Sequence, residues 1–142
     1  MQYPNLRFTM NKKMLFIVLA LAFFNTAYSQ INLDSLYTIW ENKVMADTIR
    51  MEALNKFING PSLFMSNTDS TLTLSNRMYE MAIKSKSKKY EVIALQIQGT
   101  CYTLLKDNIK GKDLLEQSLK IAEKINDHDG ISLSLNDLGV SY

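Results

Sequence analysis

The amino-acid sequence predicts an all-α fold, specifically an α-solenoid of antiparallel helix pairs with a period of about 40 residues. The composition supports this class, because 46% of the 142 residues are apolar and only 5 are Gly and 2 are Pro. Apolar residues recur three and four positions apart over long stretches, as they do on one face of a helix. In addition, the chain matches itself when it is shifted by 40 positions.

The internal repeat falls mainly on small and apolar positions, whereas most surface positions drift between the copies. Gly99 and Gly139 occupy the same place in the two copies. Because Gly inside a helix costs about 1 kcal/mol relative to Ala, their recurrence predicts close contact with a neighbouring helix at both positions. The matched residues are Leu74, Ala82, Lys84, Leu95, Gly99 and Tyr102 in one copy and Leu114, Ala122, Lys124, Leu135, Gly139 and Tyr142 in the other.

Three helices are expected in the first part of the mature chain. Residues 34–44 predict a helix that caps the first repeat, with Trp40 and Val44 on its apolar face. We interpret Trp40 as a packing residue rather than a platform for a ligand. Residues 47–58 predict the next helix, which the following Asn-Gly-Pro sequence terminates. Residues 69–84 align with the second helix of a repeat.

Three further helices are separated by polar turns. An Asp or Asn at the end of each turn is the expected N-cap, because its side chain accepts a hydrogen bond from a free backbone N–H. The first of these turns offers Asp107 or Asn108 as the cap, and the second offers Asp129, with His128 in the turn. The helices are expected at residues 90–105, 109–125 and 130–142.

The beginning of the chain has the pattern of a cleaved secretory signal over residues 10–29. Two lysines precede an unbroken apolar run of 11 residues, which is shorter than the roughly 17–25 residues of a membrane span. Residues 1–9 fit no part of this pattern, so we interpret them as an over-extended start. For residues 10–29, the alternative to a cleaved signal is an uncleaved anchor or a buried helix. The expected cleavage site lies between Ser29 and Gln30, and it predicts an exported protein, periplasmic or secreted.

The charge of the mature part argues against nucleic acid as a partner. From Gln30 onward, 13 basic residues stand against 14 acidic ones, so no excess of positive charge is left. One local cluster of lysines falls between residues 84 and 89. It is interpreted as a solvated turn between helices, and the alternative is a patch for an anionic partner.

The residues of the repeat resemble the tetratricopeptide repeat family, over roughly residues 68–142. The chain departs from the family signature at four positions, with Leu95 for the aromatic residue, Gln98 for Leu, Gly111 for Ala and Leu115 for Phe. It also lacks the closing Pro, and its period is about 40 rather than 34 residues. This resemblance divides the mature chain into residues 30–66, with the capping helices and a degenerate first repeat helix, and residues 67–142, with repeats of which the last is truncated. The residues that stand at the signature positions are Leu95, Gln98, Gly99, Tyr102, Gly111, Leu115 and Ser118, and then Leu138, Gly139 and Tyr142 in the second, partial copy.

The resemblance implies a protein or peptide ligand, held on the concave face that the first helix of each pair lines. The basic clamp for a peptide carboxylate is absent, because Gln96 and Thr100 stand at the matching places. A homodimer is a further possible assembly. The positions that the resemblance assigns to the concave face are Ile93, Gln96, Thr100, Thr103, Asn136 and Val140.

The order of segments resembles the exported sensor region of bacterial signalling proteins, in which such repeats precede a membrane helix and an adenylate/guanylate cyclase or sensor histidine kinase. Since the last expected helix presents an apolar face without a following partner, we expect the chain to be the N-terminal fragment of such a membrane-anchored protein. The alternative is a free periplasmic or secreted scaffold without a catalytic partner.

Catalysis within this chain is not expected. The sequence has one His and one Cys, so multi-histidine or cysteine-rich metal sites and intramolecular disulfides are excluded. Cys101 is interpreted as a small buried residue rather than a nucleophile paired with His128. No Gly-rich phosphate loop follows a predicted strand, so no cofactor is assigned.

Overall fold

The computed structural model describes residues 11–15, 33–60 and 67–140. The chain divides into two units, residues 1–34 and 35–142. In the first unit, residues 12–15 form one exposed helical turn. The over-extended start at residues 1–9, most of the expected signal, and its cleavage site between Ser29 and Gln30 lie outside the described residues. No helix in the described part of the chain has the length and apolar character needed to cross a membrane.

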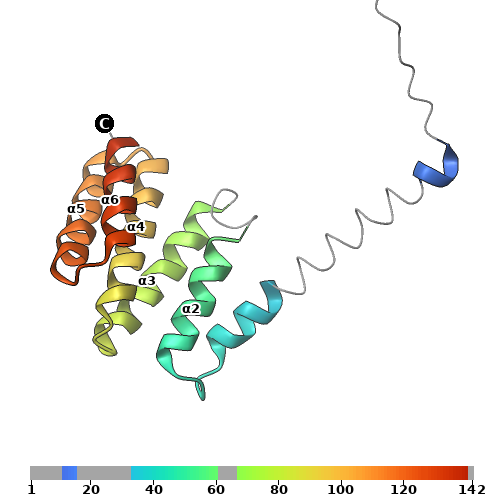
Figure 1. The fold of residues 1–142 in the computed structure, drawn as a ribbon, viewed down its shortest axis with the longest axis horizontal. Coiled ribbons are helices and arrows are strands. Elements are labelled where there is room, and N and C mark those ends of the chain that lie inside the picture. Colours follow the sequence, from blue (N-terminus) through green and yellow to red (C-terminus); the bar gives the residue numbers. More distant parts are fainter. Residues whose placement is uncertain (1–10, 16–32, 61–66, 141–142) are drawn as a thin grey trace, which may run out of the picture. The chain divides into compact units, whose positions relative to one another are not determined.

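All regular elements among the described residues of the second unit are helices, which confirms the all-α class (Figure 1). Each labelled helix packs against the next one along the chain, and α4 also contacts α6. A helix at residues 33–41, cyan in Figure 1, precedes the labelled ones. The labelled helices are α2 (Asp47–Ile58), α3 (Thr68–Lys84), α4 (Lys88–Leu104), α5 (Asn108–Lys124) and α6 (His128–Val140).

The first helix of this unit is shorter than its sequence predicts, because it ends at residue 41 rather than at Val44. The Asn42 side chain accepts a hydrogen bond from the Val44 N–H at 3.1 Å, and this local turn replaces the helix. Val44 is consequently 95% exposed. Trp40 is buried, which confirms its interpretation as a packing residue.

The start of α6 also differs from the prediction. We expected Asp129 to be the cap, but the helix begins two residues before Gly130, at His128, and Asp129 lies inside it. The carboxylate of Asp127 accepts a hydrogen bond from the Gly130 N–H at 3.1 Å. The same arrangement begins α5, where Asp107 accepts from Lys110, so the prediction of a cap at 107 or 108 is resolved in favour of Asp107.

Three identical turns join the last four helices. In each turn the central residue has a positive φ, of 57° at Lys86, 66° at Lys106 and 55° at Asn126. The N–H of the residue after it bonds to a carbonyl five positions earlier at 2.9 Å in all three turns. These are Schellman motifs, which terminate a helix by reversing the chain direction. Because successive helices begin 20 residues apart, a helix pair with its turns occupies 40 residues.

The structure therefore repeats with the period of the sequence. Helix α5 begins and ends 40 residues after α3. Residues 71–90 and 111–130 are buried, half-buried and exposed at the same places, with position 74 against 114 as the one difference. Helices α3 and α5, with the turns that follow them, therefore bury equivalent faces.

The core runs along α4, which is buried around most of its circumference. A Cβ added at Gly99 would lie 2.7 Å from Leu115 Cγ and 3.0 Å from the Gly111 carbonyl oxygen, so the predicted close helix contact is confirmed there. Among the described residues the same contact is not found at Gly139, because a Cβ added there would have no atom within 4 Å apart from the backbone of its own helix and its chain neighbours. Buried members of the core include Trp40, Met51, Leu54, Ile58, Met78, Ala82, Tyr90, Ala94, Ile97 and Cys101.

Candidate functional site: a groove across alternate helices

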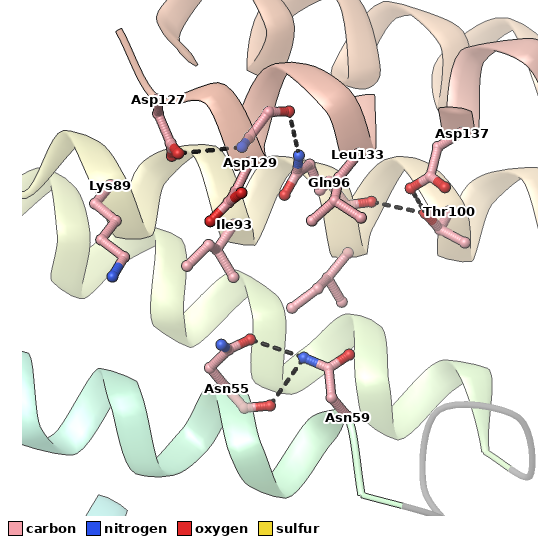
Figure 2. Close-up of a pocket in the computed structure, with 12 residues that line it drawn as sticks. Asn55, Asn59, Lys89, Ile93, Gln96, Thr100, Asp127, Asp129, Leu133 and Asp137 are labelled. Atoms are coloured by element: carbon pink, nitrogen blue, oxygen red, sulfur yellow. Dashed lines mark hydrogen bonds between the residues drawn. The ribbon is translucent and has the colours of Figure 1, made fainter. Parts of the chain in front are cut away.

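A groove of about 500 Å³ lies across α2, α4 and α6, which are alternate helices in chain order (Figure 2). Helices α3 and α5 contribute no residue to it. The turn before α6 adds Asp127 at one end. A cavity of this size holds part of a peptide or a small molecule.

The groove has a different character on each helix. From α2, Asn55 and Asn59 present amide groups one turn apart. The Nδ2 of Asn59 donates to Asn55 Oδ1 at 2.8 Å and to the Asn55 carbonyl at 3.0 Å, which holds the pair in place. From α4, Ile93 and Ile97 supply apolar surface. One side of the groove is therefore rich in hydrogen-bonding groups, and its middle is apolar.

The third side of the groove is acidic. Asp129, Leu133 and Asp137 follow one another at intervals of four residues along α6, so they lie on one face of the helix. Leu133 is 55% exposed although it is a large apolar residue. Asp137 accepts a hydrogen bond from the Thr100 hydroxyl at 3.0 Å, which links this side to α4.

A buried chain of hydrogen bonds holds α4 and α6, two helices of the groove, at a fixed spacing with the help of α5. The Gln96 side chain donates from Nε2 to the Gly130 carbonyl at 2.8 Å and to Ser134 Oγ at 3.0 Å. Ser134 and Ser118 lie 3.1 Å apart through their hydroxyls, and Ser118 donates to the Val92 carbonyl at 3.1 Å. The chain thus joins α4, α5 and α6, and neither bond of Gln96 uses its Oε1 atom.

Lys89 is a cation that lines the groove, and the carboxylate of Glu52, outside the groove, partly balances its charge. The pKa of the Glu52 carboxyl is lowered, chiefly by the hydrogen bond from the Tyr90 hydroxyl at 2.9 Å, with a smaller contribution from the charge of Lys89. Burial, together with this bond, raises the pKa of Tyr90 to about 12. The Lys89 ammonium also lies 5.9 Å from the Tyr90 ring centre.

The six positions assigned to the concave face divide equally between groove and surroundings. Ile93, Gln96 and Thr100 line the groove. Thr103 instead donates to the Gly99 carbonyl and lies against Gly111 of α5. The remaining two residues, Asn136 and Val140, are exposed and line no part of the groove, because the side of α6 that faces α4 carries Gly130 and Ser134 instead.

Two rows of residues bound the groove on α4 and α6, and only Ile93 among them was predicted from the sequence. A signal was available, because Lys89, Ile93 and Ile97 correspond to Asp129, Leu133 and Asp137 after a shift of 40 positions. The Asn residues of α2 carried no such signal, since α2 lies outside the clear part of the repeat. The groove residues not foreseen are Asn55, Asn59, Lys89, Ile97, Asp127, Asp129, Gly130, Leu133 and Asp137.

A second hollow of about 280 Å³ lies beside Trp40, and the side chains around it hold helices together. The guanidinium groups of Arg50 and Arg77 lie 5.2 and 5.1 Å from the Trp40 ring. Both groups are engaged, since Arg50 pairs with Asp47 at 3.2 Å and Arg77 with Glu41 at 2.8 Å. This cluster joins the helix at residues 33–41 to α2 and α3.

Cys101 and His128, the cysteine and the histidine of the chain, lie in different environments. Cys101 is buried in α4, and burial raises the pKa of its thiol to about 11, so the reactive thiolate is disfavoured. His128 is exposed at the first turn of α6. Within the described ranges, no group of three or more His, Cys, Asp or Glu side chains is arranged to hold a metal ion.

Comparison with known proteins adds no family to this geometry. No protein-family model, no curated protein and no solved structure matches the chain.

Proposed function

We propose that the helices from α2 to α6 form a solenoid of the tetratricopeptide type, and that its function is to hold a segment of another protein. The observation that carries this proposal is the groove across α2, α4 and α6. Alternate helices share one surface only when the helix pairs stack in register, and such a surface is the usual binding face of a helical solenoid.

The chemistry of the groove suits a peptide chain. The apolar surface of Ile93, Ile97 and Leu133 gives a side chain a place to be buried. The amide groups of Asn55 and Asn59 offer donors and acceptors to a backbone. Because the chain of bonds through Gln96 fixes the spacing of α4 and α6, the groove is formed before the ligand arrives.

The test uses two leucines of α6 that are equally exposed. Leu133 is 55% exposed and lines the groove, whereas Leu135 is 54% exposed and does not. Peptides that bind the purified chain would be selected from a random library and titrated against Leu133→Gln and Leu135→Gln. We expect affinity to fall about fivefold to tenfold in Leu133→Gln, because about 1 kcal/mol of apolar burial is lost.

The matched variant Leu135→Gln should bind as the unaltered chain does. A library that yields no binder, or binders that Leu135→Gln weakens as much as Leu133→Gln, would overturn the proposed function. Both variants keep the net charge, so this outcome does not depend on the charge of the ligand.

We place this module, as part of the same proposal, in the exported sensor region of a signalling protein with a cyclase or histidine kinase output. The order of leader, capping helix and repeats supports this setting. Reading the coding DNA beyond the codon for Tyr142 tests it. A membrane span followed by a catalytic domain agrees with the sensor role, whereas further repeats alone indicate a free scaffold.

A further inference from the structure

The charges along the groove differ in sign and in how they are engaged. Three carboxylates, of Asp127, Asp129 and Asp137, line the groove together with a single ammonium, of Lys89. Each ion pair found in the described part of the chain involves other acidic residues. The acidic side of the groove therefore keeps its negative charge for a ligand.

These carboxylates are spread along the groove rather than gathered at one point. Asp129 and Asp137 are eight residues apart on α6, which corresponds to about 12 Å along the helix axis. They do not form a group that holds a metal ion, among the residues that the structure describes. Leu133 lies midway between them on the same face, so the order along this side is acidic, apolar, acidic.

An extended peptide has side chains at a matching interval. Residues i, i+2 and i+4 of an extended chain point to the same side, and four residues span about 13 Å. A basic residue at i and another at i+4 would thus reach Asp129 and Asp137. An apolar residue at i+2 would meet Leu133 and the isoleucines of α4.

We propose that the groove binds an extended segment of a partner protein in which two basic side chains flank one apolar side chain, in the spacing basic-x-apolar-x-basic. This proposal rests on the proposed function, because it names the class of peptide that the groove selects. The charge complementarity of the α6 side and the match of the two spacings carry it.

The test measures the binding of capped, fluorescently labelled nonapeptides to the whole chain by anisotropy at low ionic strength. The first peptide has Lys-Ser-Leu-Ser-Lys at its centre. The second has Glu-Ser-Leu-Ser-Glu, and the third has the same composition as the first in the order Lys-Lys-Leu-Ser-Ser. We expect the first peptide to bind about tenfold more tightly than either of the others, and to weaken as salt is added.

Two charge variants of the protein locate the effect. In Asp129→Asn/Asp137→Asn, the affinity of the first peptide should fall about tenfold. In Glu116→Gln/Glu123→Gln, which removes the same charge from exposed positions of α5 outside the groove, the affinity should stay the same. Equal loss in both variants would overturn the proposal, because it would show attraction to net charge alone.

Other results also decide the question. Equal or tighter binding of the glutamate peptide would show that the groove takes an acidic segment, and equal binding of the reordered peptide would show that spacing plays no part. If none of the three peptides binds, the proposed ligand class is wrong. The proposed function is judged separately by the library-selected peptides and the two leucine variants, so the two failures are distinguishable.

Discussion

Helices α4 and α6 begin 40 residues apart and share the sequence repeat, yet their surroundings differ. Leu95 of α4 is 3% exposed, and Leu135, 40 positions later in α6, is 54% exposed. A Cβ added at Gly99 of α4 would collide with α5, while one added at Gly139 of α6 would meet no other helix in the described part of the chain. The same residue types in the same register are thus core in one helix and surface in the other. Whether such a position is buried is therefore decided by the helices packed against it, which for α4 are chiefly α3 and α5, and not by the residue type.

The largest effect on stability is expected from truncating one of the two equivalent leucines, Leu95 and Leu135. Leu95→Ala should lower the free energy of unfolding by about 2–5 kcal/mol, because it leaves a cavity beside α4. Leu135→Ala should change it by less than about 0.5 kcal/mol, since its side chain is already exposed. Urea denaturation of both variants measures the difference, and similar losses in the two would show that α6 is covered in solution.

Replacing the two equivalent glycines by Ala should change the stability of the fold in opposite directions. Gly99→Ala should destabilise the fold by about 1–3 kcal/mol, because its Cβ forces α5 away from the Gly111 backbone. Gly139→Ala should stabilise α6 slightly, by up to about 0.5 kcal/mol, through its better helix propensity. Thermal unfolding followed by circular dichroism distinguishes these signs, and a stabilised Gly99→Ala variant would contradict the close contact.

A third test concerns how the two helices are anchored at their beginnings. Tyr90 of α4 donates to Glu52 of α2, whereas its counterpart Gly130 in α6 uses its backbone carbonyl to accept from Gln96. The pKa of Tyr90 is raised from 10.0 to about 12, first by burial and then by the Glu52 hydrogen bond. Tyr90 therefore loses its proton at a lower pH in the unfolded chain than in the folded chain.

This anchor should give the fold an alkaline dependence. Stability from Tyr90 is fully present below pH 10 and is lost as the pH rises from 10 to about 12. Tyr90→Phe should cost about 1 kcal/mol at neutral pH, through the lost hydrogen bond. The variant should also lose less stability between these pH values than the unaltered chain. Parallel urea titrations at pH 8 and pH 11, reference points on either side of the ordinary tyrosine pKa of about 10, would show whether the two curves converge.

The smallest expected effects lie in the turns that leave α4 and enter α6. Lys106 has a φ of 66° and Asn126 one of 55°. Glycine adopts this conformation without strain, and Asn tolerates it better than Lys. Lys106→Gly should therefore stabilise the fold by about 0.5–1 kcal/mol, and Asn126→Gly by a few tenths. Equal gains in denaturation midpoint would show that residue type matters less at this place than the turn geometry implies.

Much of the helical framework followed from the sequence, because it depends on local chemistry. The 3.6-residue spacing of apolar residues, with the polar turns and a cap at 107 or 108, predicted α2 to α5 within two residues at each end. Where a prediction was wrong, a local competitor decided the outcome, as at Asn42, whose side chain closes a turn before Val44.

The site depended on contacts that no local pattern contains. The resemblance to the repeat family indicated six concave-face positions, of which Ile93, Gln96 and Thr100 line the groove and the other three do not. It did not reveal which side of α6 faces α4, and hence that Asp129, Leu133 and Asp137 close the groove. Helix type, turn position and period are properties of neighbours in sequence. Which surfaces are core, groove or exposed was decided only by packing between helices that begin 20 and 40 residues apart.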